Sequence, residues 1–262
     1  MNLTKISAIA RVTFSDLIRD RVLYNILFVS IALFLIALLT AQLSVLSRDR
    51  IVIDFGLAGQ VLSLSFVALF YGSNLIRKEM ERRTLGIALS RPCSRFEFLL
   101  GKYLGLVALI ALDWLLLTLS FLLIVGNFTE ASWANLSLSL FAGIFFSLLE
   151  ALVVAAFAIG LSVPTSKTLA IFVTVSLMII GSNVTQWREV ISKIEGGTLI
   201  KVLRWATYFF PQFELYHLGT QLAYSVPVGF EQVLLAMIHT AFFVSLMLFI
   251  GGVSLRNKEL LS

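Results

Sequence analysis

The order of apolar and polar residues divides the chain into long apolar segments joined by shorter polar ones. Six apolar runs reach about 20 residues, the length that crosses the hydrocarbon core of a bilayer as an α-helix. They are Val22–Val45, Gly56–Ile76, Phe96–Val125, Leu136–Val163, Thr168–Gln186 and Val233–Leu255. A membrane β-barrel would instead show alternating segments of roughly ten residues. The pattern predicts an all-α polytopic membrane protein, a single domain over residues 1–262, with six transmembrane helices.

Two further segments have patterns of their own. Residues 1–21 carry apolar side chains at three- and four-residue intervals and charged ones on the other side. This spacing predicts an amphipathic helix lying in the membrane plane. A cytoplasmic extension of the first span is the alternative.

Residues 187–232 form a long loop between the fifth and sixth spans. Its aromatic residues gather around Pro211, and they are Trp205, Tyr208, Phe209, Phe210, Phe213 and Tyr216. Aromatic side chains at this density are typical of the membrane–water interface. We expect one or two short helices on, or dipping into, the outer leaflet; a small extracellular cap is the alternative.

Composition and charge agree with a membrane protein and orient it. Only 13% of residues are charged, against about 25% in soluble domains. An N-terminus in the cytoplasm puts 14 of the 20 Lys and Arg residues in cytoplasmic segments, as the positive-inside rule requires. The net charge of +5 therefore does not indicate nucleic acid. We expect both termini in the cytoplasm and membrane lipid as a partner.

Residues 77–95, between the second and third spans, are unusually rich in charge. Glu79 stands three and four residues before Arg82 and Arg83, so these side chains can pair along one helical face. Arg91 precedes a proline, which ends that helix. Ser94 and Glu97 have the spacing of a capping box that starts the next helix. The positive-inside rule alone explains the positive charge, but not a short capped helix that also carries Glu79 and Glu81.

Polar and small residues inside the predicted spans suggest further roles. Gly101 and Gly105 have the GxxxG spacing that permits close helix approach, with a dimer contact as the candidate use. Asp113 and Glu150 are carboxylates within spans, each costing about 2.5–3.5 kcal/mol to insert. They are candidates for a substrate path or proton relay. The alternative is that they are hydrogen-bonded to hydroxyls of neighbouring helices or are protonated.

Sites for catalysis or metal binding are not indicated. The lone GK sequence, Gly101-Lys102, lacks the rest of a phosphate-binding loop. His217 and His239 have no second ligand three or four residues away, which argues against a metal site. The single cysteine, Cys93, excludes an intramolecular disulfide and a site of several thiolates. We expect a protein that is not an enzyme and binds no cofactor itself.

The stretch "EMERRTLGIALSRPCSRFEFLLGKYLG" resembles the permease subunits of ABC-2-type transporters, which belong to the ATP-binding-cassette exporter class. The resemblance extends to the N-terminal helix, the six spans and the "FFPQFE" segment. It is nearest to the small permeases of nitrous-oxide-reductase maturation, gliding and bacteriocin-export systems.

The resemblance implies a permease in the bacterial cytoplasmic (inner) membrane. Two permeases, as identical copies or paralogues, would work with two ABC ATPase subunits, which bind ATP and Mg²⁺. It also leaves room for an accessory extracytoplasmic protein. The residues around 77–95 would form a cytoplasmic coupling helix, with ATPase contacts at Glu79, Glu81, Arg82, Arg83, Arg91 and Arg95. An ion- or proton-coupled secondary transporter using Asp113 and Glu150, and a membrane scaffold without transport, are the competing hypotheses.

Overall fold

The computed structural model describes residues 3–20, 24, 31, 32, 35, 39, 48–81, 94–128, 138–194, 207, 210–217 and 228–258. These residues form helices and turns, and no strand occurs among them, which confirms the predicted all-α class. The elements in chain order are α1 (Leu3–Ile18), α3 (Arg48–Leu75), α4 (Arg77–Glu81), α6 (Arg95–Phe128), α7 (Leu138–Ser162), α8 (Lys167–Gly181), α9 (Val184–Lys193), the 3₁₀ helix η2 (Phe213–Tyr216) and α12 (Phe230–Lys258).

Four stretches of helix are long and apolar enough to cross a membrane. They cover Val52–Met80, Arg95–Gly126, Ser139–Ser162 and Phe230–Arg256. Apolar helices are thereby confirmed at the second, third, fourth and sixth predicted spans. The first predicted span, Val22–Val45, lies outside the described residues except for five helical positions, Tyr24, Ile31, Ala32, Leu35 and Leu39.

The fifth predicted span, Thr168–Gln186, is not one straight helix. It is divided into α8 and α9, which are bent by 57° relative to each other. The Ser182 hydroxyl donates to the Met178 carbonyl over 2.9 Å, and the Asn183 amide donates to the Ile179 carbonyl over 2.8 Å. Such side-chain bonds compete with helix continuation. The 15 residues of α8 reach about 22 Å, short of the roughly 30 Å hydrocarbon core, so a fifth crossing would need both pieces.

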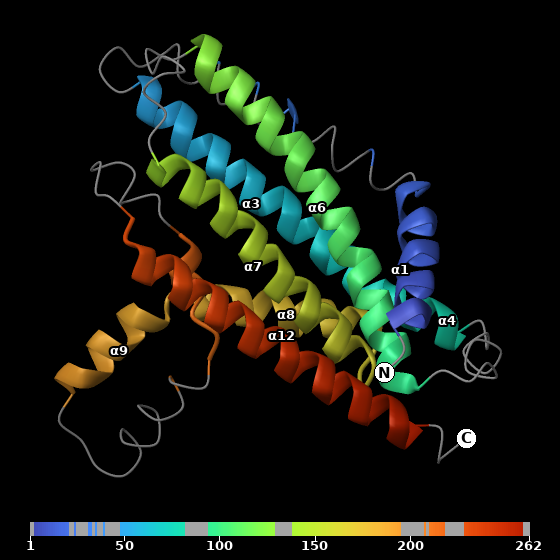
Figure 1. The fold of residues 1–262 in the computed structure, drawn as a ribbon. Coiled ribbons are helices and arrows are strands. Elements are labelled where there is room, and N and C mark those ends of the chain that lie inside the picture. Colours follow the sequence, from blue (N-terminus) through green and yellow to red (C-terminus); the bar gives the residue numbers. More distant parts are fainter. Residues whose placement is uncertain are drawn as a thin grey trace.

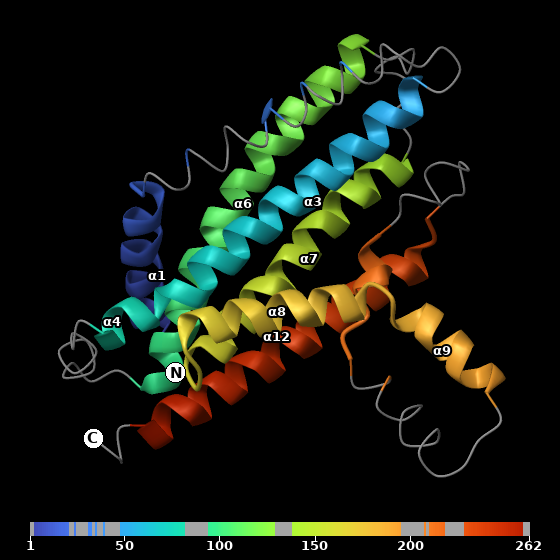
Figure 2. The same ribbon diagram turned by 180° about the vertical axis from the view of Figure 1, so that it is seen from behind.

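The long helices pack side by side in the order α6, α3, α7, α12 in both views of the fold (Figures 1 and 2). α7 is the central and most buried of them and contacts α3, α6, α8, α12 and η2. Small residues mark its crossings. A Cβ on Gly72 would lie 2.8 Å from Ala158 Cβ, and one on Gly160 would lie 2.7 Å from the Met247 carbonyl oxygen. Close backbone approach of this kind is typical of helices packed in membranes.

Candidate functional site

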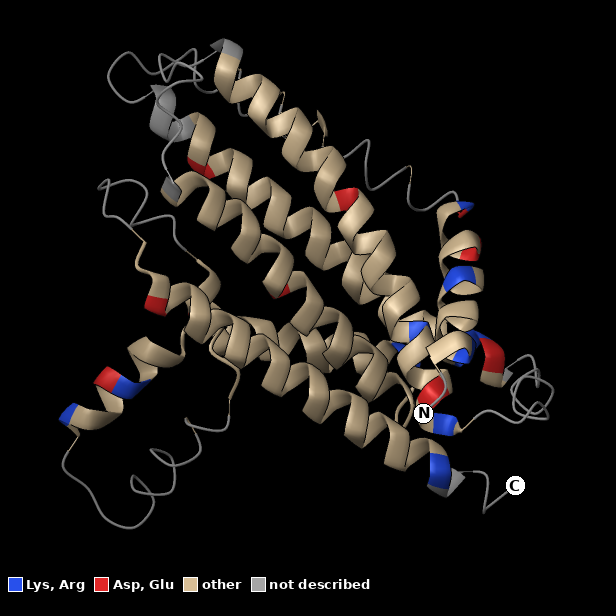
Figure 3. Ribbon diagram, in the orientation of Figure 1, with Lys and Arg blue, Asp and Glu red and all other residues tan. Residues whose placement is uncertain are grey.

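Basic side chains gather at one end of the bundle. The N-terminal ends of α1, α6 and α8 meet the C-terminal ends of α3, α7 and α12 there (Figure 3). The Lys and Arg residues at this end whose side chains the structure describes are Lys5, Arg77, Lys78, Arg95, Lys102, Lys167 and Arg256. We call this end of the bundle the basic end. All seven belong to the set predicted to face the cytoplasm, and the fold brings them together.

The predicted coupling segment begins as a short helix at this end. α4 starts after a turn at Ile76, directly beyond α3. Glu79 lies on α4, and Glu81 is its last residue. Arg82, Arg83 and Arg91 lie outside the described residues. The pairing predicted between Glu79 and the two arginines therefore stays a prediction.

Glu79 has a partner that its local sequence did not indicate. The Lys102 ammonium, from the first turns of α6, forms an ion pair with the Glu79 carboxylate. It also lies over the Phe98 ring, 5.7 Å from the centroid, a cation–π distance. The Lys102 side chain is 10% exposed and that of Glu79 is 24% exposed. The pair is shielded enough to hold α4 against α6.

Two arginines bond to the ends of other helices. The Arg77 guanidinium donates to the Thr165 carbonyl in the turn between α7 and α8, over 2.8 Å. The Arg95 guanidinium donates to the Arg256 carbonyl near the end of α12, over 3.0 Å. Both carbonyls lie at or just beyond helix C-termini, where cationic side chains are favourable. These bonds tie the start of α4 and of α6 to the neighbouring spans.

The predicted capping box is confirmed at the start of α6. The Glu97 backbone N–H donates to the Ser94 hydroxyl over 3.2 Å, and the Ser94 backbone N–H donates to the Glu97 carboxylate over 3.0 Å. Two backbone donors that the helix leaves unpaired are thereby satisfied. The helix that follows the proline therefore begins where the local sequence predicts.

The GxxxG residues do permit close helix approach, but to a different partner than predicted. A Cβ on Gly101 would lie 2.8 Å from Ile9 Cβ, and one on Gly105 would lie 2.6 Å from Thr13 Cβ and 2.8 Å from the Ala10 carbonyl oxygen. The partner is α1 of the same chain, so this face is filled from within. The close approach of α1 accounts for both glycines, and their use in a dimer contact stays a prediction.

The two intramembrane carboxylates have different surroundings. Asp113 on α6 is 1% exposed, and neither of its carboxylate oxygens has a hydrogen-bond partner in the described part of the chain. The alternative of a bond to a neighbouring hydroxyl is therefore not seen for Asp113. Such a carboxyl is far cheaper to bury when neutral.

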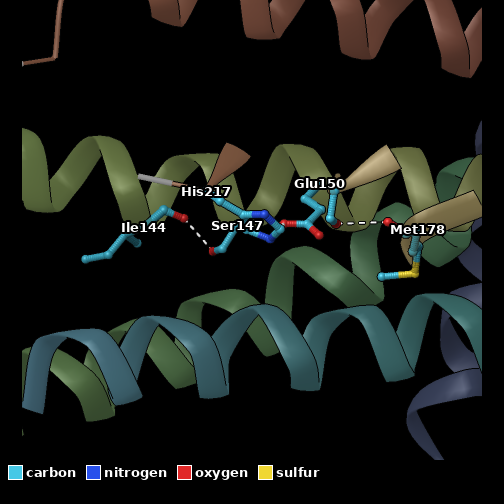
Figure 4. Close-up of polar contacts among 6 residues, drawn as sticks. Ile144, Ser147, Glu150, Met178 and His217 are labelled. Carbon is cyan, nitrogen blue, oxygen red and sulfur yellow. Dashed lines mark hydrogen bonds and ion pairs between the residues drawn. The ribbon is translucent and has the colours of Figure 1, made fainter. Parts of the chain in front are cut away.

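Glu150 lies midway along α7 and has a titratable neighbour from far along the chain. His217 Nε2 is 3.5 Å from Glu150 Oε2 (Figure 4). The Glu150 side chain is 2% exposed, whereas that of His217 is 42% exposed. At this separation the contact is an ion pair rather than a well-formed hydrogen bond. Contact with the Glu150 carboxylate raises the pKa of His217, with a smaller contribution from Glu214 and against the opposing effect of burial.

His217 reaches this depth because residues 210–217, which we call the aromatic segment, enter the bundle. η2 within the segment packs against α7, α8 and α12. Phe213 and Tyr216 are completely buried. A Cβ on Gly181 would lie 2.3 Å from the Pro211 carbonyl oxygen, so glycine at the end of α8 admits the segment. Phe213 and Tyr216 are therefore part of the core of the bundle, and the predicted position of the segment at the outer leaflet stays a prediction.

A chain of hydrogen bonds fastens the segment to α12. The Gln212 backbone N–H donates to His239 Nε2 over 3.1 Å. The other ring nitrogen, Nδ1, lies 2.8 Å from the Tyr216 hydroxyl, which lies 2.8 Å from Thr240 Oγ1. Thr240 in turn donates to the Ala236 carbonyl over 2.8 Å. Each polar group in this series, from the Gln212 backbone N–H to the Ala236 carbonyl, has a hydrogen-bond partner.

The directions of these hydrogen bonds are set by the groups at the two ends. A backbone N–H can only donate, so His239 Nε2 accepts and carries no proton. The proton of the neutral ring is then on Nδ1 and is donated to Tyr216. Since the Thr240 hydroxyl donates its proton to the Ala236 carbonyl, the Tyr216 hydroxyl donates to Thr240 Oγ1. The network requires neutral His239.

Sequence reasoning set both histidines aside because neither has a ligand nearby in sequence. Their partners lie on other elements, which spacing along one helix does not reveal. One signal was available: His217 directly follows the aromatic stretch around Pro211, and His239 lies early in the sixth predicted span. No group of three or more His, Cys, Asp and Glu residues suited to a metal occurs in the part of the chain that the structure describes.

Comparison with known proteins identifies one family. A family model described as "Protein of unknown function (DUF2705)" matches residues 51–261, which include most of α3, the elements from α4 to α12, the aromatic segment and every residue of the basic end except Lys5. No curated protein matches the chain. The match covers most of the 262 residues, and the chain belongs to the DUF2705 family.

Proposed function

We propose that this chain is the permease subunit of an ABC transporter of the ABC-2 type, active in export and driven by separate ATPase subunits. The observation that carries the proposal is the charged segment that begins at Arg77, between two long apolar helices, at the end of the bundle where basic side chains gather. A segment in this position would be available to a soluble partner on the cytoplasmic side. The resemblance of residues 79–105 to ABC-2-type permeases supports the same assignment.

The contacts of α4 favour a role in transmitting force. A partner that pushes on the coupling segment would move α6 through the Glu79–Lys102 ion pair. It would move the turn between α7 and α8 through the bond from Arg77 to the Thr165 carbonyl. Rigid-body shifts of packed helices are an ordinary means of switching between two states of a bundle. ATP-driven closure of two ATPases would then tilt the spans between inward- and outward-facing arrangements.

The residues that would bind the ATPase can now be divided. Glu79 and Arg95 make bonds within the chain, so their role in the proposal is to hold the coupling segment in place. Glu81, Arg82, Arg83 and Arg91 are the proposed contacts to the ATPase. ATP and Mg²⁺ would bind to that subunit, and both termini of the permease would face the cytoplasm of a bacterial cell.

The test is co-expression of the chain with a cassette ATPase encoded beside it. The two proteins should co-purify, and the complex should hydrolyse ATP faster than the ATPase alone. Glu81→Lys should weaken the complex, whereas Lys193→Glu on the exposed helix α9, at a distance from the basic end, should leave it intact. A complex that never forms, or one that Glu81→Lys and Lys193→Glu affect equally, contradicts the proposal.

Exchanging the charges of Glu79 and Lys102 distinguishes two roles for Glu79: holding the coupling segment in place, or contacting the ATPase directly. Glu79→Lys alone should slow ATP turnover in the complex, and Glu79→Lys/Lys102→Glu should restore it, because the exchanged residues again attract each other. If the double variant is as slow as the single one, Glu79 acts on the ATPase directly.

A proton-coupled secondary transporter is the second candidate, favoured by the Glu150–His217 ion pair and by the unpartnered carboxylate oxygens of Asp113. The two candidates differ in their energy source. Proton uptake driven by a pH gradient in vesicles that contain this chain without any ATPase, lost in Glu150→Gln, would support the second candidate and contradict the first.

A further inference from the structure

We propose that Glu150 and His217 form a proton-binding site in the middle of the helical bundle, which is occupied when the aromatic segment is seated against α7. The site takes one proton for each chain, which the imidazole carries beside the carboxylate. It goes beyond the transport function proposed above and does not depend on it.

The position of Glu150 creates the need for a bound proton. Its side chain is 2% exposed and lies at the midpoint of α7, and its Oε2 atom has no hydrogen bond in the part of the chain that the structure describes. A carboxylate in such a place is costly unless a positive charge or a proton accompanies it. The neighbour that the fold supplies is His217, which is positive only when it is protonated.

His217 is suited to exchange that proton. Its side chain is 42% exposed in the described chain, so it can reach the surroundings while one ring nitrogen faces the buried carboxylate. The imidazole is the side chain whose ordinary pKa allows protonation and release near neutral pH. Contact with Glu150 raises the pKa of His217, in the direction expected for a proton held between the two groups.

The other titratable and charged groups around the aromatic segment do not take over this role. His239 on α12 accepts the Gln212 backbone N–H, so protonation of its Nε2 would break a bond that anchors the segment. Glu214 lies within the segment and increases the attraction for a proton on His217. Arg188 on α9 donates to the Thr207 carbonyl over 2.8 Å, and its guanidinium faces the Gln212 side chain. The exchangeable proton is therefore assigned to the Glu150–His217 pair.

Loss of the proton has a structural consequence. With His217 neutral, the attraction that draws the aromatic segment toward α7 disappears, and Glu150 must take up a proton itself or gain another partner. The bonds to His239 and Thr240 persist, since they need no charge. Proton binding is thus linked to how firmly His217 holds its end of the segment on α7.

The chain has only two histidines, which makes a direct test possible. Full-length protein labelled with ¹⁵N-histidine in lipid vesicles should give ring signals from His217 and His239 alone, assigned with His217→Gln and His239→Gln. We expect His239 to stay neutral, with its proton on Nδ1, between pH 5 and 8. His217 should be an imidazolium at low pH and should lose its proton at a higher pH in the wild type than in Glu150→Gln.

Tyr216→Phe is the matched control variant, because it alters the hydrogen bonds of His239 and leaves the Glu150–His217 pair in place. It removes the acceptor of the His239 Nδ1 proton, so the His239 Nδ1 signal should shift, while Nε2 keeps accepting from the Gln212 backbone N–H. The His217 titration should shift less than in Glu150→Gln. The proposal is overturned if His217 titrates at the same pH in the wild type and in Glu150→Gln. It is equally overturned if His239 is the ring that binds the proton between pH 5 and 8. If Glu150→Gln does not fold, Glu150→Asp provides the comparison, because the shorter carboxylate retreats from His217 and should lower its titration midpoint.

Discussion

The basic end and the aromatic segment both join parts of the chain that are far apart in sequence, but they do so with different chemistry. At the basic end, Glu79 and Lys102 remain partly exposed, and arginines donate to carbonyls at helix ends. In the aromatic segment, Tyr216 is buried and belongs to an ordered series of hydrogen bonds that reaches Thr240 of α12. An ion pair at the edge of the bundle tolerates exchange of its two charges, whereas a buried hydrogen-bond network is costly to leave unsatisfied. Substitutions at the basic end should therefore have graded effects on stability, whereas the buried network should tolerate few substitutions.

The largest expected effect is on the α1–α6 contact at the basic end, which depends on shape rather than charge. Gly101→Ala/Gly105→Ala would push added Cβ atoms against Ile9, Thr13 and the Ala10 carbonyl. Overpacking of this kind costs about 1–3 kcal/mol at each site. Unfolding of the purified protein in mixed micelles, followed by circular dichroism, measures the loss.

Gly229→Ala is the control for that experiment, since nothing lies within 4 Å of a Cβ at Gly229. If the double variant is as stable as Gly229→Ala, α1 is not packed on α6 as described. The contact across the GxxxG face would then have to be assigned to something other than α1.

The next effect compares two buried tyrosine hydroxyls. Tyr216→Phe removes the partner of His239 Nδ1 and the hydroxyl that donates to Thr240 Oγ1, which should cost about 1–3 kcal/mol. Tyr103→Phe removes a single bond to the Leu152 carbonyl of 3.1 Å and should cost about 0.5–1.5 kcal/mol. The same unfolding measurement ranks them. Equal losses would show that the network around His239 contributes no more than an isolated hydrogen bond.

A smaller effect is expected at the start of α6. Ser94→Ala removes the hydroxyl that accepts the Glu97 backbone N–H, and loss of such a cap costs roughly 1 kcal/mol. Ser245→Ala, at an exposed position within α12 that bonds only back to the Ala241 carbonyl, should be near neutral because alanine favours the helix interior. A Ser94 variant as stable as Ser245→Ala would contradict the capping box.

The smallest effect is the pH dependence of stability. The pKa of His217 is raised in the folded protein, so its contribution is fully present below the unfolded value of about 6.5. That contribution is lost as the pH rises through the higher folded value. Stability in mixed micelles should therefore fall from about pH 6.5 upward in the wild type by more than in Glu150→Gln. Parallel pH profiles for the two proteins would show that the ion pair does not contribute to stability. The effect is small because His217 is partly exposed.

Local patterns in the sequence predicted what depends on neighbouring residues. The apolar runs predicted four of the long helices, and the Ser94–Glu97 spacing predicted a helix start that the structure confirms. The local sequence Gly181-Ser182-Asn183 also indicates the break after α8, but it lies within an apolar run that predicted one continuous span. Hydrophobicity measures the environment of a helix, whereas its continuity depends on which groups bond to its last carbonyls.

By itself, the sequence determined that the chain is helical and apolar enough for a membrane, which ends of its helices are charged, and where α6 begins. Only the tertiary structure decided that Gly105 packs on α1, that Lys102 pairs with Glu79, and that His217 lies beside Glu150. The physical reason is the separation along the chain over which each interaction acts. Helix periodicity and capping act over three or four residues, whereas the partner of a buried charge is chosen by the packing of elements that are distant along the chain.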